Sequence, residues 1–347
     1  MREKFEFRVP EKHAGRLFSE DEGTRMGETV RKVFLFGDDP RLRQVGRLDR
    51  EIRELAEEPP RYFFAGWNIQ RCYSKDELST ARLFTLLVKS TFEPAGEECG
   101  TEYNELTACP KCGAGAAQVS DLRLDLRKVP KTKEIATTIA GEIIVSQRLA
   151  EKMIDAGLAG FELRPVRHKA RYEDDPIDLH LLPTGREILR KAAAVGDPYP
   201  TGRFWVWLNR AENRLLSEQA RQENAALKAG ENRRSGEAMP VWHQLVVTSA
   251  SAEIAPPTRV GINPFDDDPK GECRCPLGDL IGLNLLSEVS IKAASRGDDD
   301  VVCSRQFIGV RRGLLRPRRV ILISPKFWTL IESENLKGVD IEVAHLV

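Results

Sequence analysis

The chain has 347 residues, more than one compact core usually holds, so we expect about two domains. Its 53 lysines and arginines balance 53 aspartates and glutamates, and this zero net charge argues against a general polyanion binder while leaving local basic patches open. Apolar residues make up 41% of the chain, which is typical of a soluble globular protein. No apolar stretch approaches the length of a membrane span and the N-terminus lacks a signal-peptide core, so we expect a cytoplasmic protein without a membrane partner.

The N-terminal region, residues 1–60, is charged and poor in apolar residues, and we expect it to be an accessory region. Residues 5–9 alternate between apolar and polar side chains, which predicts an edge strand, and residues 33–36 predict a second strand. Residues 47–58 predict a solvated helix that ends at two prolines.

Residues 61–170 form the first predicted α/β half. Residues 62–64 and 83–90 predict strands, and the strict alternation of residues 122–126 predicts a half-buried strand. The motif Cys-Pro-Lys-Cys-Gly at residues 109–113 is expected in a loop between the strands at 83–90 and 122–126.

Residues 171–239 have no counterpart elsewhere and read as a helical insert and linker. Residues 186–194 and 209–229 predict helices, residues 204–207 predict a strand, and the charged residues 231–237 predict a linker. The second predicted half, residues 240–347, repeats the order of the first. A strand at 242–249, a Pro/Gly loop, the motif Cys-Arg-Cys-Pro at 273–276 and a strand at 286–291 follow one another.

Each half ends in a similar segment, residues 142–164 and 320–342, and the two align without a gap when Ser146 is set on Ser324. An apolar β-branched run predicts a strand, the serine predicts a helix N-cap, and a short alternating run predicts a second strand. Apolar residues at i and i+4 give each helix one apolar face: Leu149 with Met153, and Phe327 with Ile331. Residue types that tolerate the left-handed conformation end the helices: Gly157 and Asn335. The sequence therefore predicts an α+β fold of two similar halves, each ending in a strand–helix–strand unit.

Two cysteine pairs stand at metal-type spacing. Cys109 and Cys112, two residues apart and followed by glycine, can turn both sulfurs toward one tetrahedral ion. A structural zinc needs four ligands, so we expect Cys273 and Cys275 to supply the second pair and one Zn²⁺ to join the halves.

Other assignments of the cysteines remain open. Cys99, His243 or Asp279 could complete the ligand set, or one cysteine of the second pair could bind alone. The pairs could also be free thiols of a lost metal site. A thioredoxin-like redox pair is disfavoured because loop residues, and no helix, follow Cys109.

The remaining polar residues predict no reaction. The five histidines form no metalloprotease pattern, and neither a phosphate loop nor a dinucleotide fingerprint occurs, so we expect no catalytic residues. Acidic runs at 174–175 and 266–268 are typical of solvated loops. Three tryptophans are expected in the core: Trp205, Trp207 and Trp242. A basic loop carries five arginines that could contact a partner: Arg311, Arg312, Arg316, Arg318 and Arg319.

The motif that contains Cys109 and Cys112, together with the two strand–helix–strand segments, resembles bacterial proteins of the double-CxxCG-motif group known from myxobacteria and the neighbouring immunity-protein families of polymorphic toxin systems. The likeness covers about residues 62–166 and 240–347, and it departs at the second motif, which is Cys-Arg-Cys-Pro. The resemblance implies a non-enzymatic, zinc-stabilised protein that binds and neutralises a toxin.

We therefore expect a binding protein of the immunity type that occludes a protein partner through a few buried aromatic and arginine contacts. One alternative is a nucleic-acid-binding module that uses the arginines of residues 311–319. A second alternative is a hydrolase with a zinc-bound water, which requires an open coordination position.

Overall fold

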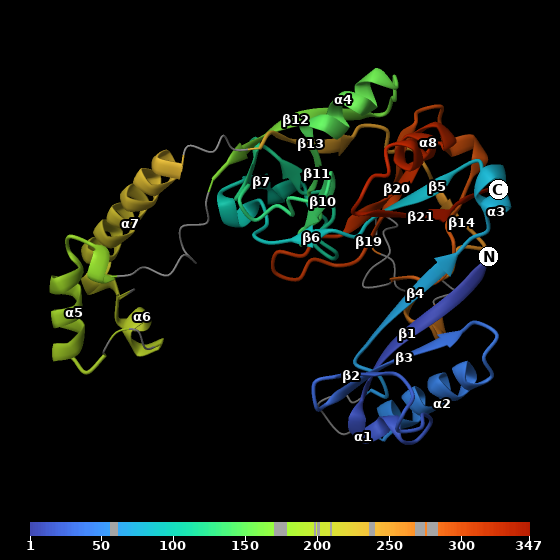
Figure 1. Cartoon of the computed structure of the whole chain (residues 1–347), viewed down its shortest axis with the longest axis horizontal. Coiled ribbons are helices and arrows are strands. Elements are labelled where there is room, and N and C mark those ends of the chain that lie inside the picture. The colour runs from blue at the N-terminus through green and yellow to red at the C-terminus, as the bar shows by residue number, and fades with distance from the viewer. Residues whose placement is uncertain are drawn as a thin grey trace.

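The computed structural model describes residues 1–55, 62–169, 179–197, 199, 202–208, 210–235, 240–267, 275 and 284–347. The fold is mixed α+β, as the sequence predicts, with the strands gathered in several small sheets (Figure 1). A lobe formed by the N-terminal strands and a separate helical lobe flank a central body of sheets (Figure 1).

The N-terminal lobe contains a four-stranded antiparallel sheet in the order β2-β3-β1-β4. Its strands are β1 (Arg2–Pro10), β2 (Thr24–Met26), β3 (Val30–Phe36) and β4 (Gly66–Cys72). The helices α1 (Glu11–Ala14) and α2 (Arg41–Glu54) pack on one face, over a core that includes Phe7 and Phe63. Because β4 pairs with β1, β1 is a central strand and the edge-strand prediction is wrong. The lobe therefore extends past residue 60, and α2 buries Val45 and Ile52 against it, so this helix is not fully solvated.

Two larger sheets form the body. One runs in the order β6-β10-β11-β13-β12-β9 and the other in the order β19-β20-β5-β21. Strands of the first are β6 (Thr91–Phe92), β9 (Leu122–Leu124), β10 (Ile135–Thr138), β11 (Ile143–Ser146), β12 (Phe161–His168) and β13 (Trp242–Val247). Strands of the second are β5 (Phe84–Val88), β19 (Val301–Ile308), β20 (Arg318–Ile323) and β21 (Val339–Val343).

Shorter elements complete the described body. The helix and strands are α3 (Lys75–Thr80), β7 (Tyr103–Asn104), β8 (Ala117–Gln118), β14 (Ile254–Ala255), β15 (Val260–Asn263), β16 (Asp266–Asp267), β17 (Asn284–Leu285), β18 (Ser290–Ile291) and β22 (His345–Leu346). Its 3₁₀ turns are η1 (Glu97–Cys99), η2 (Glu105–Thr107) and η5 (Ala293–Ser295). The predicted strand at 286–291 is thus confined to its last two residues, and residues 62–64 lie outside any strand. Asp266 and Asp267, expected in a solvated loop, form β16.

Both predicted strand–helix–strand units are confirmed, as β11–α4–β12 and β20–α8–β21, with α4 (Gln147–Asp155) and α8 (Pro325–Ser333). Ser146 caps α4 by accepting from the Leu149 amide at 3.2 Å, and Ser324 caps α8 by accepting from the Phe327 amide at 3.3 Å. The residues that end the two helices adopt the left-handed backbone conformation, with a φ of 59° at Gly157 and 48° at Asn335.

Each unit encloses a strand that lies outside the unit in sequence. β13 lies between β11 and β12, and it is antiparallel to both. In the other sheet, β5 lies between β20 and β21 in the same antiparallel arrangement. β10 and β19 then pair antiparallel with β11 and β20, so the two sheets share one pairing pattern.

A side-chain detail also recurs. Thr101 donates to the carbonyl of Arg123 and accepts from its amide, at 3.3 and 2.9 Å. Thr258 makes the same two bonds with Ser290, at 3.3 and 2.8 Å. Thr101 thereby bonds to β9, which pairs in parallel with β12. Thr258 bonds to β18, which pairs in parallel with β22.

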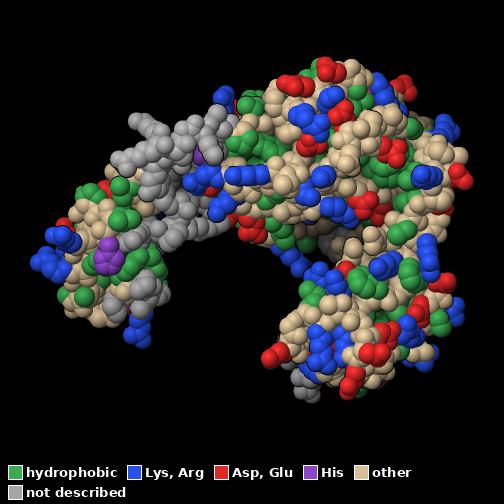
Figure 2. Space-filling view, viewed as in Figure 1, with side chains coloured by type: hydrophobic (Ala, Val, Ile, Leu, Met, Phe, Trp, Pro, Cys, Tyr) green, Lys and Arg blue, Asp and Glu red, His purple; other side chains and the backbone are tan. Residues whose placement is uncertain are grey.

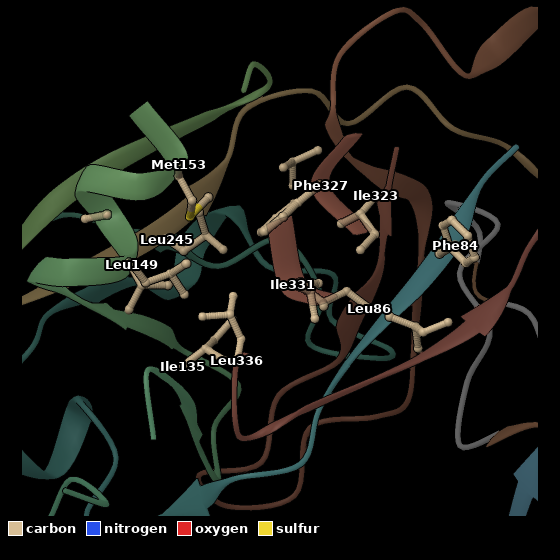
Figure 3. Packing of buried hydrophobic residues seen from close by; sticks show 14 residues of the cluster. Phe84, Leu86, Ile135, Leu149, Met153, Leu245, Ile323, Phe327, Ile331 and Leu336 are labelled. Carbon is tan, nitrogen blue, oxygen red and sulfur yellow. The ribbon is translucent and has the colours of Figure 1, made fainter. Parts of the chain in front are cut away.

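One apolar cluster lies between the units. Leu149 and Met153 of α4 face Phe327 and Ile331 of α8 across it, with Leu245 of β13 beside them (Figure 3). Glu334 links the two helices on the surface by pairing with Arg148 at 2.8 Å and Lys152 at 2.9 Å. Both predicted apolar helix faces are therefore buried against each other.

The helical lobe comprises η3 (Leu179–Leu181), α5 (Gly185–Ala194), α6 (Gly202–Leu208), η4 (Ala211–Asn213) and α7 (Arg214–Ser235) around a core of its own. The strand prediction for residues 204–207 is wrong. Phe204 and Trp207 lie three residues apart on α6, and a helix turns both into the lobe core. Trp242 is buried in the body and Trp205 partly buried in the lobe, as expected of core tryptophans. α7 continues to Ser235, so the predicted linker at 231–237 begins as helix.

Candidate metal centre

Three cysteines converge at the centre of the candidate site. The Sγ atoms of Cys109, Cys112 and Cys275 all lie within 4.8 Å of one another, and all three residues are buried. Ala114 packs with them, and Phe307 of β19 lies against the group. The site therefore brings Cys275 to the turn that holds Cys109 and Cys112, as the sequence predicts for these three residues.

The backbone around the first pair forms a tight turn. The amide of Cys109 donates to the carbonyl of Ala114 at 2.7 Å, and the amide of Gly113 donates to the carbonyl of Cys109 at 2.7 Å. Gly113 has a φ of 77°, and a Cβ there would lie 2.6 Å from the Cβ of Arg311, so glycine is required at this position. The amide of Ala114 donates to Cys112 Sγ at 3.5 Å, which would stabilise a thiolate there.

The thiols differ in acidity. Hydrogen bonds from the backbone amides of Cys112 and Lys111 lower the pKa of the Cys109 thiol. Burial raises the pKa of the Cys112 thiol to about 12. Metal ions bind thiolates, so binding here would release thiol protons and depend on pH.

The donor set fits a soft, tetrahedral ion. Zinc–sulfur bonds of about 2.3 Å in a tetrahedron place neighbouring sulfurs about 3.8 Å apart. The observed separations, all within 4.8 Å, exceed that spacing by at most about 1 Å. Three buried sulfurs therefore can hold a metal ion, and thiolate ligands favour zinc or copper(I) over magnesium or calcium.

The other candidate ligands are distributed differently. Cys273 and Asp279 lie outside the described residues. Cys99 is buried in η1 and does not belong to the three-cysteine group. His243 is in β13, where its Nε2 atom lies 2.5 Å from Gln147 Oε1. Among the described residues, only Cys275 joins the first pair as a metal-type ligand.

Two arginines of the predicted basic loop are engaged within the chain. Arg316 pairs with Glu97 at 2.9 Å and Glu105 at 2.8 Å, its side chain is only 10% exposed, and its guanidinium lies 4.1 Å from the Tyr103 ring centroid. Arg311 pairs with the same two carboxylates, and its amide donates to the Cys112 carbonyl at 2.9 Å. Arg311 thus links the loop to the cysteine turn, and both arginines link it to Glu97 and Glu105.

The other three arginines lie on the same hairpin. Arg318 and Arg319 are in β20, and Arg312 forms an isolated bridge with Leu315. The guanidinium of Arg319 lies 4.4 Å from the Phe307 ring centroid, and its Nη1 atom is 3.9 Å from Cys303 Sγ. The structure therefore does not bring all five arginines together as one free basic surface.

A buried carboxyl group that no sequence pattern indicated lies beside these arginine–glutamate pairs. Glu142 accepts from the Tyr103 hydroxyl at 2.8 Å and from the Gly96 amide at 3.2 Å, and it also bonds the Thr138 hydroxyl. Burial raises the pKa of Glu142. Its partners come from three separate loops and strands, so no local sequence pattern could have revealed them.

Neither a protein-family model, a curated protein nor a solved structure matches this chain. The resemblance to double-CxxCG and immunity-type proteins therefore stays a prediction. Within the described part of the chain, no helix combines the length and apolarity needed to cross a membrane.

Proposed function

We propose that this chain is a zinc-stabilised binding protein that occludes a protein partner, in the manner of the immunity-type proteins it resembles. The observation that carries the metal part is the buried convergence of Cys109, Cys112 and Cys275. Cys273 supplies the fourth sulfur in this proposal, because it is two residues from Cys275 and completes the set that a closed zinc site needs.

A structural role suits the position of the site. Cys112 and Cys275 are separated by more than 160 positions of sequence, 275 − 112 = 163. An ion held by the three cysteines would link these two distant parts of the chain where Arg311 already packs on the cysteine turn. Such an ion contributes directly to folding free energy, since the unfolded chain does not present the ligands together.

The partner surface is assigned to the helical lobe. Large apolar side chains remain exposed on its turns and helices: Leu181, Val195, Val206, Leu215 and Leu227. Figure 2 shows hydrophobic side chains at several points on the surface of this lobe. Apolar side chains left exposed on a lobe that already has its own buried core are a common basis of protein–protein contact.

The metal part is tested by metal analysis of protein purified under reducing conditions. We expect one equivalent of zinc in the parent chain and in Cys72→Ser, an exposed cysteine that serves as the control. Cys109→Ser/Cys112→Ser and Cys275→Ser should lose the metal and unfold at lower temperature. A parent chain with far less than one equivalent would contradict the proposal.

Cobalt substitution distinguishes the structural site from the hydrolase alternative. A spectrum with four sulfur ligands, reduced to three by Cys273→Ser, supports the closed structural site. If the spectrum of the parent chain instead indicates three sulfur ligands and an exchangeable water, it would favour the hydrolase hypothesis, because hydrolysis by a zinc-bound water requires an open coordination position.

The partner part is tested by capture from the native host with three versions of the tagged chain. We expect one stoichiometric protein with the parent and with Leu106→Glu, a 96% exposed residue of the body. Leu181→Glu/Val206→Glu should lose that protein while keeping its zinc and thermal stability. Undiminished capture by the lobe variant would exclude the lobe as the partner surface.

A further inference from the structure

The outer face of the N-terminal sheet is basic and aromatic. Along β1, Phe5, Phe7 and Val9 point into the core beneath α1 and α2. The alternate positions of β1 therefore point to the opposite face: Arg2, Lys4, Glu6 and Arg8. The register of β1 with β3 places three residues beside them on this face: Lys32, Phe34 and Phe36.

The two phenylalanines are large apolar groups left in solvent. Phe34 is 39% exposed and Phe36 is 40% exposed. They stand two residues apart on one strand, which separates their Cα atoms by about 6.8 Å along β3. Neither ring belongs to the core cluster on the other face of the sheet, so the fold does not use them for burial.

Cations surround both rings. The Nζ atom of Lys4 lies 4.0 Å from the Phe34 ring centroid, and that of Lys32 lies 5.4 Å from it. The guanidinium of Arg2 lies 3.7 Å from the Phe36 centroid. Exposed cation–π pairs of this kind contribute about 0.5–1 kcal/mol each, so the cations can be redirected to a ligand at modest cost.

This face carries a net charge that the whole chain lacks. Arg2, Lys4, Arg8 and Lys32 give four positive charges, and Glu6, which pairs with Arg8 at 3.4 Å, gives one negative charge, so 4 − 1 = +3. The complete chain is neutral. Lysine and arginine side chains are visible together on this lobe (Figure 2). The face thus attracts anions locally.

Polar side chains border the aromatic pair. Asn68 and Gln70 are exposed on β4, and the register of β4 with β1 places them opposite Glu6 and Lys4 on the same face. Their amide groups can both donate and accept hydrogen bonds, as base edges and sugar hydroxyls require.

We propose that this sheet face binds a single strand of nucleic acid, with bases stacked on Phe34 and Phe36 and phosphates held by Arg2, Lys4, Arg8 and Lys32. Exposed aromatics on an open sheet, flanked by cations, suit flat bases on a polyanionic backbone. A duplex hides its bases, so it would contact only the cations. The proposal does not depend on the cysteine site, and failure of either leaves the other standing.

The test measures fluorescence anisotropy of labelled oligo(U) and oligo(dT) of about 12 nucleotides, a length within the usual site size of such platforms. We expect binding at low salt by the full chain, and weaker binding of a duplex of equal length. Phe34→Ala/Phe36→Ala should weaken binding about tenfold or more, because each stacked base contributes on that scale. Phe34→Tyr/Phe36→Tyr should restore it, since tyrosine also offers a ring.

Charge and control variants complete the design. Lys4→Gln should lower the slope of log affinity against log salt by about 0.7, the value for one phosphate contact with a single strand. Leu106→Ala/Leu215→Ala removes exposed apolar side chains elsewhere and should leave binding unchanged. No binding at about 0.1 mM protein and low salt, or equal binding by the double alanine variant at Phe34 and Phe36, would overturn the proposal. Loss of binding on Arg312→Gln, with no effect of the phenylalanine changes, would move the site to the basic loop.

Discussion

The two helix caps should differ in their contribution to stability, although they occupy matching places. The hydroxyl of Ser146 accepts the cap bond from the Leu149 amide, so Ser146→Ala should cost about 1 kcal/mol. Ser324 caps α8 and also donates to Asp300 Oδ1 at 2.6 Å. A hydrogen bond to a charged group contributes about 1.5–3 kcal/mol. Asp300 keeps a bond from the Ala159 amide at 3.1 Å, so the lower end of that range applies. Ser324→Ala should therefore cost about 2–3 kcal/mol.

Urea unfolding followed by tryptophan fluorescence measures both changes, since Trp328 lies within α8. A double-mutant cycle identifies the source of the difference. In an Asp300→Asn background, Ser324→Ala should cost about 1 kcal/mol, the value of the cap alone. Ser324→Thr, which keeps a capping hydroxyl, is the conservative control. Equal losses for the two alanine variants, or no coupling between Ser324 and Asp300, would refute this reasoning.

Three further predictions concern other buried groups. The Arg71 side chain is 3% exposed and joins the N-terminal lobe to Glu342 of β21, with a separation of 2.7 Å. Arg71→Met leaves the buried carboxylate unpaired, so it should lower the free energy of unfolding by about 3–5 kcal/mol, as measured by thermal unfolding. Adding Glu342→Gln should recover part of that lost stability. Burial raises the pKa of Glu142 above the usual 4.5, so the folded chain binds this proton more tightly than the unfolded chain and stability falls as pH rises through the raised pKa. Glu142→Gln should flatten that decline in a pH series of urea midpoints, and an unchanged slope would contradict a neutral buried carboxyl. Gly160 has a φ of 97°, and a Cβ there would lie 2.0 Å from a carbonyl oxygen of β19, so Gly160→Ala should prevent stable folding. Gly27 has a φ of 69° but open space around it, so Gly27→Ala should cost only about 1–2 kcal/mol. Similar melting temperatures for the two variants would show that the close approach at Gly160 is unimportant.

Local patterns predicted the strand–helix–strand units because each depends on residues close in sequence. A capping serine, apolar residues at i and i+4 and a left-handed stop specify a helix within one short segment. The strand between β11 and β12 could not be predicted in this way, because β13 is supplied from far along the chain and any apolar strand has the same local pattern. The same limit explains residues 204–207, where burial in the lobe core overrides the strand propensity of their aromatic and β-branched side chains.

The candidate metal site likewise has features that local sequence predicts and contacts between distant residues that it does not. Spacing and a following glycine identified Cys109 and Cys112, and the order of motifs in the two halves identified Cys275 as their companion. The pairing of Arg311 and Arg316 with Glu97 and Glu105 was not predictable, because more than 200 positions of sequence separate the partners. A basic run in sequence does not show which of its charges are already neutralised in the fold.

The crossed position of β5 and β13 affects how the chain is made. β5 is apolar and emerges from the ribosome well before β20, the first of its two neighbours to be made, which begins 318 − 88 = 230 positions after β5 ends. At ordinary synthesis rates that interval lasts roughly 10–50 s, during which β5 has no sheet to enter. An unpaired apolar strand can be bound by chaperones or can pair with other nascent chains. Because β5 and β13 are each inserted between two strands from a different part of the chain, two molecules refolded at high concentration can exchange these strands, and strand-exchanged dimers are the expected misassembly of this protein.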